Sequence, residues 1–160
     1  MTRASDTAKL LGAGATILDG TTISTADNTT QLTLTSTDAD ASGGPVLDLY
    51  RNSSSPADND TVGKLLFQGE NDAGEKTTYA EVVGLMADVS NGTEDGQVTF
   101  QTIKAGALVP RLTFADSETT INDGSVDVNF RVESNGDANM LFVDGGTDTV
   151  IVGHNVSRTT

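Results

Sequence analysis

The apolar residues of this chain occur in short runs, and nearly every run is followed by a cluster of Gly, Asn or Asp. Short runs rich in Val, Ile, Thr and aromatic residues, bounded by such clusters, predict β-strands joined by turns. Large side chains are scarce, because only 36% of the 160 residues are hydrophobic and 4% are aromatic. A compact monomer of this length normally buries more, so we expect an elongated all-β fold or a core that neighbouring copies complete.

The middle of the chain predicts antiparallel strands with short connections. Strands are expected at residues 31–35, 46–51, 62–69, 78–89, 97–103 and 108–114. Residues 78–89 are numerous enough for a helix, but their Thr, Tyr and Val content favours a strand. Pro110 implies a sheet edge or a bulge. This pattern predicts a β-sandwich-like module, or a flattened barrel, over residues 31–116.

The last part of the chain, residues 117–160, has shorter strands and more frequent turns. Strands are expected at residues 119–121, 126–132, 139–143 and 149–152. Each offers only two or three inward apolar residues, and a lone hairpin of that size is not stable in water. We therefore expect an intertwined trimeric β-stalk, in which several copies wind around a shared axis and remove the open edges. The competing interpretation is a continuation of the sandwich.

The first 30 residues predict a separate N-terminal segment. Ser5 or Asp6 can cap a short helix over residues 7–11, which Gly12 and Gly14 then end. A hairpin with a type I′ turn is predicted at residues 16–23. Four apolar side chains in this segment are candidates for docking on another protein, and packing against the chain itself explains them equally well. They are Leu10, Leu11, Ile17 and Leu18.

Charge and composition exclude several classes of partner. The net charge of −14 at pH 7 argues against nucleic acid, whose phosphates would repel the chain, and against anionic membrane surfaces. No stretch approaches the roughly 18 apolar residues of a membrane span, so membrane insertion is not expected. The first six residues lack the pattern of a secretory signal, which predicts synthesis in a cytoplasm. Without Cys, the chain has no disulfides, thiolate metal sites or Cys nucleophiles.

The sequence gives little indication of catalysis, so an enzyme is not expected. His154 is the only histidine, and one His alone makes neither a zinc site nor a convincing triad. Acidic loops at residues 38–40, 58–60, 94–96 and 144–148 could supply part of a Ca²⁺ shell, although turn chemistry explains them without metal. No cofactor is expected, and bound Ca²⁺ stays an alternative. Paired carboxylates could serve a glycosidase, but sugar grooves are usually lined with aromatics, and the chain has no Trp.

One long segment carries a resemblance to a known class of proteins. Residues 128–153 have the sequence VNFRVESNGDANMLFVDGGTDTVIVG. This resembles a segment common in tail-fibre and other virion proteins of marine tailed phages. There it lies in the shaft, often upstream of a self-cleaving C-terminal intramolecular chaperone domain. Residues 49–60 and 69–80 resemble a module that often precedes it, so the resemblance covers roughly residues 30 to 153.

The resemblance implies a β-structured homotrimeric appendage whose N-terminal segment, residues 1–30, attaches to other virion proteins. We therefore expect a structural virion protein, made in the host bacterial cytoplasm, that serves as a tail fibre and holds a receptor-binding tip. One departure is that the family usually runs on into repeats or the chaperone domain after the position of Gly153, whereas this sequence ends at Thr160. The alternatives are a trimeric capsid decoration protein and a receptor-binding or depolymerase module.

Overall fold

The described part of the chain contains β-strands and no helix. The computed structural model describes residues 20 and 22–153, and every regular element among them is a strand in an antiparallel sheet. This confirms the all-β class. The chain divides into two compact units, Met1–Asp48 and Leu49–Thr160, and all the described strands belong to the second. The helix predicted over residues 7–11 lies outside the described residues.

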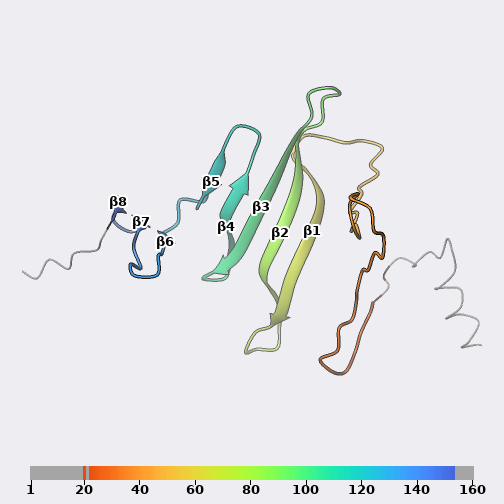
Figure 1. Ribbon diagram of the computed structural model, residues 1–160, viewed down its shortest axis with the longest axis horizontal. Helices are drawn as coiled ribbons and strands as arrows, with labels where there is room; N and C mark the ends of the chain where they lie inside the picture. The colour runs from red at the N-terminus through yellow and green to blue at the C-terminus, as the bar shows by residue number, and fades with distance from the viewer. Residues whose placement is uncertain (1–19, 21, 154–160) are drawn as a thin grey trace, which may run out of the picture. The chain divides into compact units, whose positions relative to one another are not determined.

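Five strands form one sheet in which each strand pairs with its neighbours in the sequence (Figure 1). They are β1 (Asp60–Glu70), β2 (Lys76–Asp88), β3 (Asp95–Lys104), β4 (Ala107–Phe114) and β5 (Thr119–Ile121). The strands predicted at residues 62–69, 78–89, 97–103 and 108–114 are thus confirmed. Pro110 lies where the register of β3 and β4 shifts between Phe100 and Gln101, so the predicted bulge is confirmed as well.

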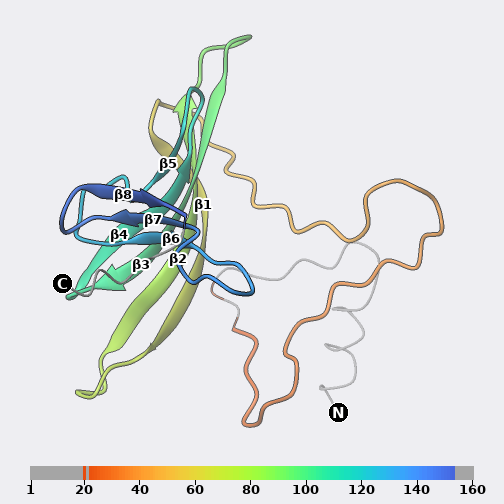
Figure 2. The same ribbon diagram turned by 60° about the vertical axis from the view of Figure 1, so that its left-hand side comes forward.

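Three short strands form a second antiparallel sheet, which Figure 2 shows with its labels. They are β6 (Phe130–Val132), β7 (Leu141–Asp144) and β8 (Thr149–Val152). Their apolar side chains are poorly covered, since Val150 is 63% exposed and Val152 is 79% exposed. Whether several copies intertwine here is not visible in a single chain and stays a prediction.

Residues 22–59 form no strand, although the sequence predicts strands at residues 31–35 and 46–51. Those two predictions are wrong for the single chain. The alternating pattern is present, but none of the described strands pairs with either segment, and an unpaired strand has no backbone ladder. Large side chains in the second segment are open to solvent, with Val46 and Tyr50 each 77% exposed. The sandwich-like packing of residues 31–116 likewise stays a prediction.

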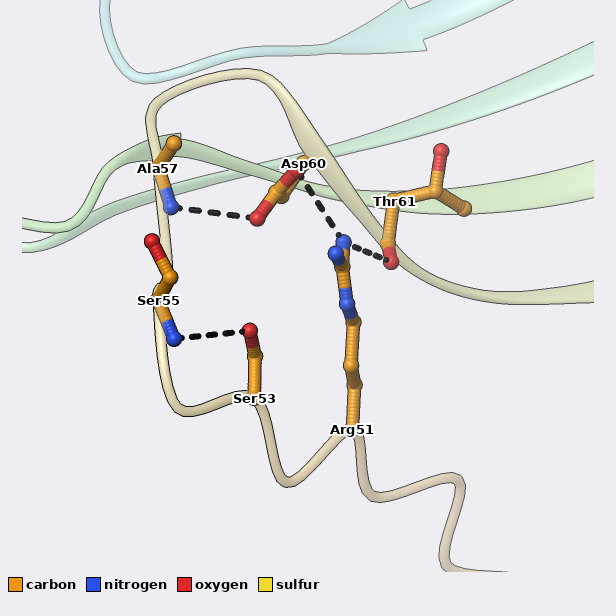
Figure 3. A network of polar contacts seen from close by, with 6 residues as sticks. All are labelled: Arg51, Ser53, Ser55, Ala57, Asp60 and Thr61. Atoms are coloured by element: carbon orange, nitrogen blue, oxygen red, sulfur yellow. Dashed lines mark hydrogen bonds and ion pairs between the residues drawn. The ribbon is translucent and has the colours of Figure 1, made fainter.

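An ion pair fastens the segment before the sheet to the start of β1 (Figure 3). The Nη1 atom of Arg51 lies 3.2 Å from Oδ1 of Asp60 and also donates a hydrogen bond of 3.1 Å to the carbonyl oxygen of Thr61. The other carboxylate oxygen of Asp60 accepts a hydrogen bond of 3.0 Å from the backbone N–H of Ala57. Through these contacts the loop at residues 51–60 holds one defined path into the five-stranded sheet.

The turn between β1 and β2 is organised by a single asparagine. Oδ1 of Asn71 accepts hydrogen bonds from the backbone N–H groups of Ala73, at 3.0 Å, and Glu75, at 2.8 Å. Its Nδ2 donates to a carboxylate oxygen of Glu75 at 2.9 Å. Gly74 has a φ of 77°, which an L-residue rarely adopts. The Asn–Asp–Ala–Gly sequence therefore fixes this connection.

We predict that Asn71→Ala lowers the free energy of unfolding by about 1–2 kcal/mol, because two turn N–H groups lose their acceptor. Urea unfolding at one fixed protein concentration measures this change. Asp72→Ala in the same turn is the matched control, because the Asp72 side chain makes no hydrogen bond with another described residue. Equal stability of the two variants would contradict the assigned role of Asn71.

The first unit contains a carboxylate with a strongly perturbed pKa. Oδ1 of Asp27 accepts hydrogen bonds from the Thr29 hydroxyl at 2.5 Å, the Thr29 backbone N–H at 2.9 Å and the Thr25 hydroxyl at 2.8 Å. These bonds favour the charged form, chiefly through the Thr29 side chain, and lower the pKa of Asp27 from 3.8 to about 2. The turn is thus stabilised above pH 3.8, and this contribution is lost as the pH falls through 2.

We predict that Thr29→Ala raises the pKa of Asp27 toward 3.8, because the hydroxyl that lowers it most is removed. Thr25→Ala should raise it less. A carboxyl-carbon NMR titration of the three proteins measures both changes. A larger rise in Thr25→Ala than in Thr29→Ala would show that the order of the two contributions is wrong.

Candidate association surface

The register of the five-stranded sheet sorts its side chains onto two faces. Residues directly opposite each other on paired strands share a face, and successive residues of a strand alternate between faces. One face carries an unbroken row of large apolar side chains, one from each strand. The row is Leu65, Val82, Phe100, Leu112 and Ile121. We call the side of the sheet that bears this row the apolar face.

Two further rows flank it on the same face. In one, Gly63 pairs with Gly84, Gly84 with Val98, and Val98 with Phe114. In the other, Phe67 pairs with Ala80, which pairs with Thr102, followed by Val109. The rings of Phe100 and Phe114 meet edge to face, with centroids 6.4 Å apart, so neighbouring rows contact each other. None of the residues in these three rows is charged.

Much of the apolar face is open to solvent. Six of its large side chains are between 39% and 59% exposed: Leu65, Phe67, Val98, Phe100, Phe114 and Ile121. A fully exposed large side chain presents about 150–250 Å², so these six leave roughly 600 Å² uncovered. This equals the largest apolar patches found on typical monomers, which often mark an interaction site.

The opposite face is more polar and is better covered. A row of threonines crosses it, in which Thr99 pairs with Thr113 and Thr113 with Thr120. Thr99 is 7% exposed and Thr113 is 4% exposed. In an isolated sheet that faces water on one side, the polar face is normally the solvated one. Here Thr99 and Thr113 are buried, whereas several large side chains of the apolar face remain open to solvent.

A buried carboxylate also lies on this polar face. Glu81, in β2, is 5% exposed, and its two carboxylate oxygens lie 3.3 and 3.4 Å from Nζ of Lys64 in β1. The side chain of Lys64 is 44% exposed, so its end of the pair stays in contact with water. Because a buried carboxylate without a cation is costly, this pair constrains the pairing of β1 with β2.

The described acidic loops use their carboxylates in turns. Asp38 and Asp40 accept backbone N–H groups of residues two positions later, and Asp144 accepts that of Gly146. Asp58 accepts the N–H of Val89, and Glu94 that of Gly92. Among residues 20 and 22–153, no group of three or more His, Cys, Asp or Glu side chains is placed to hold a metal ion.

The docking residues expected from the sequence lie outside the described part of the chain. Leu10, Leu11, Ile17 and Leu18 all fall within residues 1–19, and His154 lies beyond residue 153. Sequence reasoning did not identify the apolar face. The sequence feature that could have indicated this face is the alternation of residues 97–103, which places Val98 and Phe100 on the same side of a strand. Which residues lie beside them on neighbouring strands depends on the register.

Comparisons with known proteins give no relative. No protein-family model, no curated protein and no solved structure matches this chain. In the described residues, no helix is both long and apolar enough to cross a membrane.

We predict that Lys64→Met lowers the free energy of unfolding by about 1–3 kcal/mol, because Glu81 stays buried without its cation. The double variant Lys64→Met/Glu81→Leu should recover most of that loss, since it removes both charges and leaves apolar side chains beside Leu66. Urea unfolding of the four proteins in this cycle measures the coupling. Lys76→Met, at an exposed position, controls for the general effect of removing a positive charge. Additive losses in the double variant would contradict the assigned pairing.

Proposed function

We propose that this chain is a structural protein of a virus particle and forms the shaft part of a homotrimeric tail fibre. The observation that carries the proposal is the uncharged row from Leu65 to Ile121, which the single chain leaves exposed on one face of its main sheet. A sheet with one uncovered apolar face is stable only when another layer covers it. Further copies of the same chain supply that layer in the proposal.

The resemblance of residues 128–153 to shaft segments of marine phage fibres supports the same proposal from the sequence. In this proposal the function is mechanical. Copies that share burial are fixed to one another, residues 1–30 attach them to other virion proteins, and the assembly holds a receptor-binding tip away from the particle. The short strands β6 to β8 would then complete their core in an intertwined stalk.

The charge of the chain is compatible with this role. A net charge of −14 keeps exposed surfaces of neighbouring subunits apart and favours solubility at high local density. It also means that mutual repulsion between copies is least where the facing surfaces carry no charge. The side chains of the three central rows are uncharged, and one charged neighbour, Arg111, donates a hydrogen bond to the Thr102 hydroxyl.

We predict that the purified chain has a mass of three times 16.5 kDa in solution, because three copies complete one core. Sedimentation velocity or light scattering across a dilution series measures it. A monomer that stays folded on dilution to the nanomolar range would contradict the proposal.

Immunolabelling tests where on the particle the protein lies. Antibodies raised against the purified chain, applied to intact virus particles, should mark the tail and its fibres. Labelling spread over the shell would identify a capsid decoration protein instead. Binding or cleavage of host polysaccharide by the purified trimer would favour a receptor-binding or depolymerase module.

A further inference from the structure

At two strand positions, contacts within the same chain explain why the residue is a glycine. A glycine inside a strand weakens it, and often marks a place where another group approaches closely. A Cβ atom on Gly63 would lie 3.1 Å from the side chain of Leu49, and one on Gly69 would lie 3.4 Å from the ring of Tyr79. At both positions another side chain of the same chain occupies the space, so a larger residue would displace it.

No close contact within the chain explains the glycines at positions 84 and 96. A Cβ atom on Gly84 would have no neighbour closer than 3.8 Å, and one on Gly96 none closer than 4.0 Å. Neither residue has a positive φ, so an L-residue fits the backbone at both positions. A β-branched residue there would stabilise the strands by about 1 kcal/mol relative to glycine. The single chain therefore gains nothing from these two glycines.

The two glycines help to line a hollow beside the apolar row. The hollow has a volume of about 380 Å³, and Val98 and Phe114 line it beside the glycines. Gly84 pairs directly with Val98, and Gly96 precedes Val98 by two residues, so all three lie on the face defined above. Every residue that lines the hollow is uncharged: Val62, Gly84, Leu85, Gly96, Gln97, Val98, Phe114 and Ala115.

The same face also offers a projecting apolar side chain. Phe67 is 59% exposed and lies on β1, at the edge of the sheet. It is separated from Gly84 by four positions along the strands, because Phe67 pairs with Ala80 and Gly63 with Gly84. One surface thus carries both an apolar projection and an apolar hollow. Two copies of such a surface are complementary when the projection of one meets the hollow of the next.

We propose that the hollow lined in part by Gly84 and Gly96 receives the Phe67 side chain of a second copy of this chain. This inference rests on the proposed association of copies and names the contact that makes it. The uncovered roughly 600 Å² is close to the ~800 Å² that each partner contributes to a standard interface. A second copy fits better than a charged partner, because the residues that line the hollow are uncharged and a second copy presents the same uncharged rows. Phe67 and the hollow are separate patches, so each copy can give its Phe67 to one neighbour and receive that of the other; such a head-to-tail contact closes into a ring of three when the rotation allows it.

The test is to fill the hollow without disturbing the single chain. Gly84→Leu should leave the far-ultraviolet circular dichroism unchanged and weaken association by at least about a hundredfold, measured by sedimentation velocity over a dilution series. Gly43→Leu is the matched control, since a Cβ atom there meets nothing within 4 Å and the residue lies outside both sheets. It should associate like the unaltered protein.

Each outcome decides a separate question. If the unaltered protein associates and Gly84→Leu associates equally well, the hollow is not the contact, and the proposed trimer stands without it. If the unaltered protein is a monomer, both the trimer and this contact are overturned. If the unaltered protein and the control variant associate and only Gly84→Leu has a lower mass, the result supports both the trimer and this contact.

A second variant covers the case in which Gly84→Leu does not fold. Phe67→Ala removes the projection and leaves the hollow unchanged, so it should weaken association by a similar factor. Tyr50→Ala, which removes an aromatic side chain that is 77% exposed and lies outside the strands, is the matched control. Association of Phe67→Ala as tight as that of the unaltered protein would overturn the proposal.

Discussion

A β-sheet of one layer has to be covered on its apolar face, and this requirement governs the rest of the molecule. In the five-stranded sheet, the side chains that would form the interior of an ordinary sandwich are present on one face but have little above them. Val109 is the only hydrophobic residue with less than a tenth of its surface exposed among residues 20 and 22–153. Hydrophobic burial is the main favourable term in folding, so a sheet of this kind depends on a second layer for much of its stability.

The polar contacts of the sheet serve a different purpose. The Lys64–Glu81 pair, the Asn71 turn and the Arg51–Asp60 pair each fix one connection or one register. The Asn71 turn and the Arg51–Asp60 pair contribute modestly because they remain near solvent, whereas the Lys64–Glu81 pair constrains register because Glu81 is buried. They are sufficient to hold the order of the strands, and therefore to present the apolar row as a continuous surface. Specific pairing thus prepares the surface, and in the proposed assembly burial against a second copy would supply the larger share of the free energy.

The sequence predicted the strands of the sheet well, because each has an alternating or β-branched run that ends in a turn of the Asn, Asp or Gly type. It failed at residues 31–35 and 46–51, which have the same pattern without a partner. Alternation predicts which side chains share a face, and does not predict what pairs with the strand. The sequence also did not predict which residues share a face across the whole sheet. The register shifts at Phe67, Met86 and Phe100 change which residues stand opposite one another. No local sequence pattern predicts these shifts. The predicted docking residues fall on positions that the structure does not describe, so they stay a prediction.

The position of β1 at the outside of the sheet has a consequence for the free subunit. Its outer backbone groups form no ladder with another described strand, and eleven residues are long enough to template the addition of a foreign strand. Only one charged side chain, Lys64, interrupts its central residues. Mutual repulsion of the acidic chains is then the main barrier to growth of cross-β aggregates, and it weakens when acid or salt neutralises the carboxylates. Fibrillar precipitates of the isolated chain are expected first under those conditions.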